Sequence, residues 1–484
     1  MDRRSFLTTG VVGAGALALQ LSSNRPVAAL PSRTTEVVTS LSALQSAINR
    51  ATAGAQIVLA NGTYAVPSGS PITISGRNGT STSPITISAE TRGGVILTGP
   101  HSFLFSSSSN ITISGFSFRQ SSTLNIPAEC ARIRLTRNDF AMASTVSHSV
   151  VVRGNDAKVD RNVFRDKTTS GCYLVVDGPS GTAMAQRTHI LRNHFRDHSF
   201  SGTNGGEPIR LGVGSRALSS ANATIEYNLL ERVNGDPEAI SVKASGSTIR
   251  YNTVRDSLGG IVLRHGNNNR VDGNYILAGV NGIRIYGNDH LIVNNYVADL
   301  DELDGVGGAG IVLGSGSVRD HYSGESDTSR KGNDAPDRVT IALNTLRNNK
   351  EAIVGESQRS LPPLACKISD NLLVADSGTL VSMPYLQGIT WSGNIAWGSA
   401  STGNIPSSGY RRADPKLVAG SDGVYRISTG SAAINGGTLS LSSVTDDLDG
   451  HARSTPFDVG ADEFSTLAPV RRPLTTADVG PSAP

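Results

Sequence analysis

The chain has 484 residues, of which 38% are hydrophobic and only 17% are charged, which excludes a disordered polymer, and no apolar run reaches the roughly 18 residues of a membrane span. Its 53 glycines and its aromatic content of 5% indicate many tight turns and few bulky anchors. The formal net charge is +3, and +1 without residues 1–29, so nucleic acid is excluded as a partner and any recognition of an anion must be local.

The first element, residues 1–29, has the pattern of an export signal. An Arg3-Arg4 pair precedes a short apolar stretch from Val11 to Leu21, and small residues end the segment. The stretch is too short for a membrane anchor, so we predict a twin-arginine signal peptide that is removed on export. The protein is therefore expected to fold in the cytoplasm and to work in the periplasm or as a secreted protein.

Between residues 30 and 400 a short β-rich segment recurs, and each copy ends in Asn followed by one or two apolar residues. The short spacings between these asparagines are 21 to 24 residues, and the longest, 49, fits a coil with an inserted loop. Such a period without helical periodicity predicts an all-β fold, a parallel β-helix solenoid whose coils bury their apolar sides against each other. Asn suits the turn because it tolerates left-handed backbone and can hydrogen-bond one coil away. The recurring residues are Asn138, Asn162, Asn193, Asn228, Asn252, Asn274, Asn295, Asn344, Asn371 and Asn394.

A second pattern gives the direction of side chains on one strand of each coil. Alternating apolar residues are expected to point inward, so that Lys243 and Arg264 point outward from successive coils, with Arg210 and Arg284 on the same face. Adjacent strands lie about 4.8 Å apart, and Lys243 and Arg264 should therefore be close neighbours. Cations side by side need an anionic partner, either a ligand or nearby carboxylates.

Oxygen-bearing side chains begin the same strands: Asn204, Glu207, Asp236 and Glu238. Oxygen ligands of mixed charge suit Ca²⁺, and the lack of Cys and His in this group argues against zinc. The alternative is that these acids only neutralise the neighbouring cations in a surface ladder. The sequence pattern leaves both interpretations open.

A metal ion, a Lys and an Arg in one groove have a specific chemical use. Removal of the proton next to a uronic acid carboxylate builds up negative charge, which Ca²⁺ and Arg can stabilise. A Lys whose pKa is lowered by nearby cations can take that proton, and a donor must then protonate the leaving glycosidic oxygen. The set therefore favours β-elimination from an acidic polysaccharide.

Three motifs, Asn204–Gly212, Leu263–Asn267 and Gly282–Gly287, resemble the polysaccharide lyase family that contains alginate lyases and chondroitinase B. The resemblance covers most of residues 40–300 and is specific between residues 200 and 295. It implies a single-stranded, right-handed parallel β-helix. It also favours alginate as the substrate, with dermatan sulfate as the alternative.

The resemblance further implies roles for individual residues. Lys243 would be the general base and Arg264 the general acid, and a Ca²⁺ ion would neutralise the substrate carboxylate. Asp236 is shorter than the Glu that the family pattern carries. The implied calcium ligands are Asn204, Asp236 and Glu238. The residues implied to bind substrate are Glu207, Arg210, His265, Arg284, Tyr286 and His290.

Beyond residue 400 the pattern changes. Residues 401–466 resemble a terminal segment of secreted β-helix proteins, and we predict that they cap the last coil. Residues 467–484 are rich in Pro, Thr and Ala and are predicted to form a flexible tail. The polar, Gly-rich segment 317–337 is expected to overhang the groove. Buried free thiols are expected for Cys130, Cys172 and Cys366.

Three other functions remain open at this point. A glycoside hydrolase needs two carboxylates of which one is protonated, whereas the acids here lie beside Lys and Arg. A uronate C5-epimerase shares the proton abstraction but returns the proton. A non-catalytic glycan-binding β-helix would use the groove without chemistry. The preferred uronate, the mode of cleavage and the oligomeric state are not set by the sequence.

Overall fold

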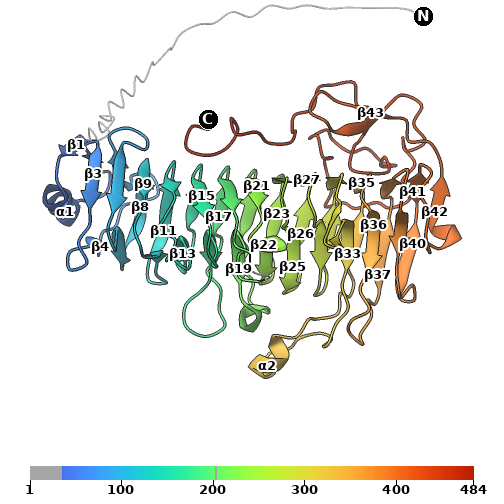
Figure 1. Cartoon of the computed structure of the whole chain (residues 1–484), viewed down its shortest axis with the longest axis horizontal. Helices are drawn as coiled ribbons and strands as arrows, with labels where there is room; N and C mark the ends of the chain where they lie inside the picture. The colour runs from blue at the N-terminus through green and yellow to red at the C-terminus, as the bar shows by residue number, and fades with distance from the viewer. Residues whose placement is uncertain (1–34, 202–203) are drawn as a thin grey trace, which may run out of the picture.

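The computed structural model describes residues 35–201 and 204–484, so the predicted signal peptide lies outside the described residues. Most coils add one strand to each of three long parallel sheets, which hold 14, 10 and 14 strands (Figure 1). The predicted parallel β-helix is therefore confirmed. In the described ranges, no helix is both long and apolar enough to cross a membrane.

The strands follow one another around the coil, so each sheet takes about every third strand of the chain. The first 14-stranded sheet contains β1 (Thr35–Val38), β2 (Gln56–Leu59), β5 (Ile85–Ala89), β8 (Ser109–Ser114), β11 (Ala131–Thr136), β14 (Lys158–Asp160), β17 (His189–Leu191), β20 (Thr224–Glu226), β23 (Thr248–Arg250), β26 (Arg270–Asp272), β29 (Leu291–Val293), β34 (Thr340–Ala342), β37 (Cys366–Ser369) and β40 (Ile389–Ser392). The ten-stranded sheet contains β10 (Leu124–Ile126), β13 (Val150–Val152), β16 (Leu174–Val176), β19 (Ile209–Gly212), β22 (Glu238–Lys243), β25 (Gly260–His265), β28 (Ile283–Ile285), β33 (Ala309–Leu313), β36 (Glu351–Gly355) and β39 (Thr379–Ser382).

The second 14-stranded sheet and the short elements complete the chain. That sheet contains β3 (Gly62–Ala65), β6 (Val95–Thr98), β9 (Phe116–Phe118), β12 (Asp139–Phe140), β15 (Val163–Lys167), β18 (His194–His198), β21 (Leu229–Val233), β24 (Thr253–Arg255), β27 (Tyr275–Leu277), β30 (Tyr296–Ala298), β35 (Thr345–Arg347), β38 (Leu372–Val374), β41 (Asn394–Trp397) and β42 (Tyr410–Arg412). Three further pairs are β4 (Ile72–Ser75) with β7 (Phe103–Ser106), β31 (Glu302–Leu303) with β32 (Val306–Gly307), and β43 (Leu417–Ala419) with β44 (Tyr425–Ile427). The helices are α1 (Leu41–Arg50), α2 (Asp327–Arg330), η1 (Gly214–Arg216) and η2 (Ser407–Gly409).

The ten recurring asparagines form a continuous ladder inside the solenoid. Each is fully buried, and each after the first accepts a hydrogen bond from the ladder residue one coil earlier, as Oδ1 of Asn274 does from the Asn252 N–H at 3.0 Å. The first, Asn138, accepts from the Phe116 N–H at 3.0 Å. The left-handed residue is the one before each ladder residue, such as Tyr251 with a φ of 55°. The prediction of left-handed asparagines is thus wrong, because the preceding residue makes the turn and leaves the Asn side chain to point inward.

Aromatic rings reinforce the register of the coils in the N-terminal half. Phe118, Phe140, Phe164 and Phe195 are fully buried, and successive ring centroids lie 4.7, 4.6 and 4.9 Å apart with nearly parallel planes. Such offset stacks add about 0.5–1.5 kcal/mol per pair beyond area burial. The three cysteines are buried and unpaired, as predicted.

The N-terminal end of the solenoid is closed by α1, a helix that was not predicted from the sequence. Ser40 caps the helix by accepting a hydrogen bond from the Ala43 N–H at 3.2 Å. Leu44, Ala47 and Ile48 are buried on one side of the helix and belong to the main core. The helix thereby covers apolar residues that the first coil would otherwise expose.

The C-terminal segment contacts the last coil and also extends along the flank of the solenoid. β42 and η2 lie against the last coil, and the rest of residues 401–466 runs along the flank opposite α2 (Figure 1). There Ile427 and Val459 pack against Ile395 of β41. Leu448 and Ala461 pack there against the rings of Tyr275 and Tyr296. Those rings belong to β27 and β30, so the segment covers coils in the middle of the solenoid.

Residues 467–484, predicted to be a flexible tail, continue along the same flank. Leu474 and Val479 bury their side chains against Leu229 of β21. Further along, Arg137 donates hydrogen bonds of 2.8 Å to the carbonyls of Pro481 and Ala483. Apolar contacts and arginine side chains together hold this segment against the solenoid.

Candidate functional site

Six of the predicted site residues lie on four neighbouring strands of the ten-stranded sheet, β19, β22, β25 and β28, and the others lie in the turns that flank these strands. The six are Arg210, Glu238, Lys243, Arg264, His265 and Arg284. Arg210 of β19 pairs in register with Ser241 of β22. Two strands further along the sheet, Arg284 of β28 pairs with Val262 of β25. Ile240 and Val242 point into the core with no exposed surface, as predicted. The alternation of β22 therefore turns Ser241 and Lys243 to the outside.

The register corrects one prediction about the two cations. Val242 pairs with Leu263, but the next pair is Lys243 with His265, because β25 has an extra residue at this point. That residue is Arg264, which occupies a β-bulge and does not stand directly opposite Lys243. A bulge redirects a side chain locally. Here Lys243 lies beside Glu207, whereas Arg264 lies beside Glu238.

Lys243 is held by a buried acid of the preceding coil. Its Nζ donates a hydrogen bond of 2.9 Å to Oε1 of Glu207, whose side chain is 2% exposed. Burial alone would raise the pKa of Glu207, but the ammonium of Lys243 and its hydrogen bond hold that pKa below its ordinary value. The Sγ of Cys172 lies 3.6 Å from the other oxygen of Glu207.

Arg264 and Arg284 share the second carboxylate, Glu238. Nη2 of Arg284 donates to Oε1 of Glu238 at 2.8 Å, and Ser241 donates to Oε2 at 2.5 Å. Nε of Arg264 lies 3.9 Å from Oε1. Burial lowers the pKa of Arg264 against the opposing effect of Glu238, and nearby Arg284 and Arg359 lower it further. Arg264 is thus a better proton donor than an exposed arginine.

Asp236 is a buried acid without a cation. It accepts backbone hydrogen bonds from Gly205 at 2.8 Å, Gly206 at 3.3 Å and Glu238 at 3.0 Å. In the described part of the chain it makes no ion pair, and burial together with Glu207 and Glu238 raises its pKa to about 6. Asn204, the residue before Gly205, is exposed. These oxygen donors and the uncompensated charge fit a Ca²⁺ ion.

Tyr286 connects the site to residues that the sequence reading missed. Its ring is 2% exposed, and its hydroxyl donates to the carboxylate of Glu356 at 2.8 Å. Gly314 makes room for this ring, because a Cβ there would lie 2.3 Å from it. Arg359 pairs with Glu356 at 3.0 Å and stands over the ring. Residues 351–356 repeat the strand pattern once more, and this repetition could have revealed Glu356.

The two predicted histidines have different surroundings. His265 is 5% exposed with a buried Nδ1 that has no partner, and burial, Arg264 and Lys243 lower its pKa to about 3. His290 is 1% exposed, and its two ring nitrogens bond to the Asn269 N–H and the Tyr286 carbonyl, both at 3.0 Å. The structure therefore corrects the prediction for His290, which supports the backbone beneath the face and does not reach it.

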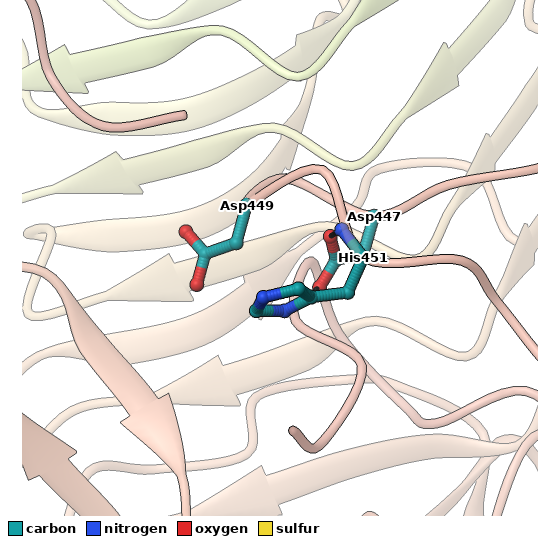
Figure 2. Close-up of side chains that lie close together, drawn as sticks. All are labelled: Asp447, Asp449 and His451. Carbon is teal, nitrogen blue, oxygen red and sulfur yellow. Dashed lines mark hydrogen bonds and ion pairs between the residues drawn. The ribbon is translucent and has the colours of Figure 1, made fainter. Parts of the chain in front are cut away.

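A different group of acids lies in the C-terminal segment (Figure 2). Asp447, Asp449 and His451 bring three ligand atoms within 4.8 Å of one another on one short stretch of chain. Asp449 already pairs with Arg426, and Asp447 accepts the backbone N–H groups of His451 at 2.7 Å and Glu463 at 2.8 Å. These contacts hold the turn in place, whereas Nδ1 of His451 is buried and has no hydrogen-bond partner among the described residues.

Comparison with known proteins gives a consistent result. A family model described as chondroitinase B matches residues 38–426, and no curated protein matches the chain significantly. The structure of the PL6 family alginate lyase AlyGC superposes with a TM-score of 0.72 at 23% identity, over 92% of this chain and 60% of that one.

Two further solved structures are similar. The PL6 family polysaccharide lyase Pedsa3628 from Pseudopedobacter saltans has a TM-score of 0.64 at 23% identity, over 92% of this chain and 99% of that one. A mannuronic acid specific family 6 lyase from human gut microbiota has a TM-score of 0.68 at 21% identity, over 78% and 91%. The chain spans about 60% of the length of AlyGC, and these likenesses establish a shared fold.

Proposed function

Since the chain belongs to the chondroitinase B family of polysaccharide lyases, we propose that it cleaves a uronate-containing polysaccharide by β-elimination, with alginate as the preferred substrate. The observation that carries the proposal is the arrangement of Lys243 and Arg264. The two residues extend from neighbouring strands, β22 and β25, and each lies beside a different buried carboxylate. A base and an acid that act on the same sugar must each lie within hydrogen-bond reach of the atom on which they act, and neighbouring strands allow this.

In this mechanism Lys243 removes the proton from C5 of the uronate. The electron pair of that C–H bond forms a double bond between C4 and C5, and the bond from C4 to the glycosidic oxygen breaks. Arg264 donates a proton to this oxygen, and solvent restores both side chains. Lys243 must release one of its own protons to solvent before it accepts the C5 proton, and its contact with Glu207 fixes the position of Nζ.

The proposal includes a Ca²⁺ ion held by Asn204, Asp236 and Glu238. When bound, the ion would neutralise the substrate carboxylate and so make the C5 proton more acidic. The buried charge of Asp236, which has no cation among the described residues, supports this assignment. Arg210 and Arg284 lie on the same face and carry positive charge that can attract the neighbouring uronates.

The test is to incubate the mature protein and Ca²⁺ with polymannuronate, polyguluronate or dermatan sulfate. The ultraviolet absorbance of unsaturated uronate ends should rise, most strongly with an alginate block. Lys243→Ala should lower the rate by about 10²–10⁴-fold. Lys158→Ala is the matched control, because Lys158 is a half-exposed lysine on β14 of another sheet.

Each rival function gives a different outcome. New reducing ends without the absorbance would indicate hydrolysis, and a changed uronate composition at constant chain length would indicate epimerisation. Binding without either product would indicate a glycan-binding module. Full activity of Lys243→Ala would contradict the mechanism.

A further inference from the structure

The insertion between β33 and β34, residues 314–339, is a loop with its own small core. It carries α2 and projects from the side of the solenoid opposite the C-terminal segment (Figure 1). His321, whose side chain is 1% exposed, pairs with Glu325 at 2.7 Å inside the loop. Asp334 accepts backbone hydrogen bonds from Asp320 at 2.9 Å and His321 at 3.3 Å, and Asn288 of the solenoid donates to it at 3.1 Å.

This fixed loop brings Asn333 to Arg264. Nη1 of Arg264 donates a hydrogen bond to Oδ1 of Asn333, which is 69 residues away in sequence. The guanidinium can only donate, so the amide oxygen must face Arg264 and the orientation of the amide is fixed. Within the described ranges, Asn333 is the only side chain that accepts a hydrogen bond from the guanidinium, since Glu238 lies 3.9 Å from it.

The amide of Asn333 also differs from the amides of the structural asparagines. In the ladder both ends of the amide are used, as when Nδ2 of Asn274 donates to Ile249 and its Oδ1 accepts from Asn252. Asn333 is 5% exposed, and its Nδ2 is buried without a partner. A residue retained for the stability of the loop would satisfy both groups. Among the described residues, the one hydrogen-bond partner of the Asn333 side chain is Arg264.

We propose that Asn333 is a positioning residue that holds the guanidinium of Arg264 toward the leaving glycosidic oxygen. This inference rests on the proposed function, in which Arg264 protonates that oxygen. A neutral acceptor is suited to the task, because it fixes the direction of the N–H groups without adding a negative charge. A carboxylate at this position would bind the guanidinium as an ion pair and oppose loss of its proton.

The test compares Asn333→Ala and Asn333→Asp with Ser329→Ala. Ser329 donates to Glu325 at 2.9 Å inside the same loop and does not touch Arg264, so it controls for loop order. Asn333→Ala should lower kcat by about 10-fold to 100-fold with less than about a threefold change in KM, because a small displacement of a reacting group has that effect. Ser329→Ala should stay within about twofold.

Asn333→Asp separates position from charge. It keeps an acceptor for Arg264 but adds a negative charge, so kcat should fall and the alkaline limb of the pH profile of kcat should move to higher pH.

A crystal structure of Asn333→Ala should show Arg264 displaced from its place beside Glu238. An undisplaced Arg264, or equal losses in Asn333→Ala and Ser329→Ala, would overturn the proposal. Absence of product from the wild-type protein would instead contradict the proposed function, and the position of Arg264 would still decide the role of Asn333.

Discussion

The outer face of the ten-stranded sheet and the C-terminal segment, residues 401–466, both combine arginines with buried acids, yet they use them differently. In the C-terminal segment Arg453 is fully buried, and its guanidinium donates five hydrogen bonds, to Asn294, Asp458, Gly460 and Glu463. On the sheet, Nε of Arg210, Nε of Arg284 and Nδ1 of His265 are buried without partners. The completed hydrogen bonds of Arg453 indicate a structural role for that side chain, and the three incomplete side chains on the sheet leave polar atoms for a ligand to bind.

The sharpest test of this comparison replaces one arginine in each region. Arg264→Ala should lower kcat by about 10²–10⁴-fold and leave the unfolding temperature nearly unchanged, because it removes a proton donor from a half-buried position. Arg453→Ala should lower the free energy of unfolding by about 3–5 kcal/mol, because it leaves Glu463 buried without its partner. Activity assays at low temperature and denaturant unfolding measure the two effects.

The specific activity of the folded fraction of Arg453→Ala should equal that of the wild-type protein. If Arg264→Ala unfolded the protein as readily as Arg453→Ala, or if Arg453→Ala lowered kcat while folded, the division between the two regions would be wrong.

Calcium should also distinguish the two groups of acids. At a free concentration 100 times its Kd, Ca²⁺ should stabilise the wild-type protein by about 2.7 kcal/mol. Asp236→Asn should abolish this stabilisation, whereas Asp449→Asn should retain it, because Arg426 already pairs with Asp449. Thermal unfolding with Ca²⁺ and with a chelator measures the difference. A response that depends on Asp449 would move the metal to the C-terminal segment.

The smallest expected effect concerns Asp462 of the C-terminal segment. Burial and the nearby Asp449 and Asp447 raise its pKa to about 8, whereas the unfolded value is about 3.9. Between these values the folded state holds a proton that the unfolded state has released, so stability from this group falls as the pH rises from about 4 to 8. Asp462→Asn should remove this slope and stabilise the protein at pH 8 by about 1–3 kcal/mol.

At pH 4 the variant and the wild-type protein should have similar free energies of unfolding, because both side chains are then neutral. Urea unfolding at both pH values provides the comparison, and an equal gain at pH 4 would rule out the titration of Asp462 as the cause.

The sequence predicted the features that repeat from coil to coil. The spacing of the asparagines gave the parallel β-helix, and strand alternation correctly placed Ile240 and Val242 inside. Predictions from the sequence failed at features that occur once in the chain and do not repeat. The bulge at Arg264 adds one residue to β25 without changing the apolar pattern. The prediction for His290 failed because its position in sequence next to the site did not reveal its burial.

Long-range contacts were likewise beyond the reach of a periodic pattern. Asn333 meets Arg264 only because the inserted loop folds back, and the contact bridges 69 residues. The C-terminal segment packs on the flank through Leu448 and Ala461, whose partners lie on β27 and β30. Nothing local to these residues specifies a partner so distant in the chain.

The asparagine ladder also explains how such a loop can exist at all. Asn295 and Asn344 are 49 residues apart, yet the N–H of the first donates to Oδ1 of the second at 2.9 Å, the distance that adjacent coils of ordinary length also show. The asparagine ladder thus aligns neighbouring coils whatever the number of residues between its members. The inserted loop beside the charged face can therefore be lengthened, shortened or exchanged by evolution or by a protein engineer, while the strands of that face keep their spacing.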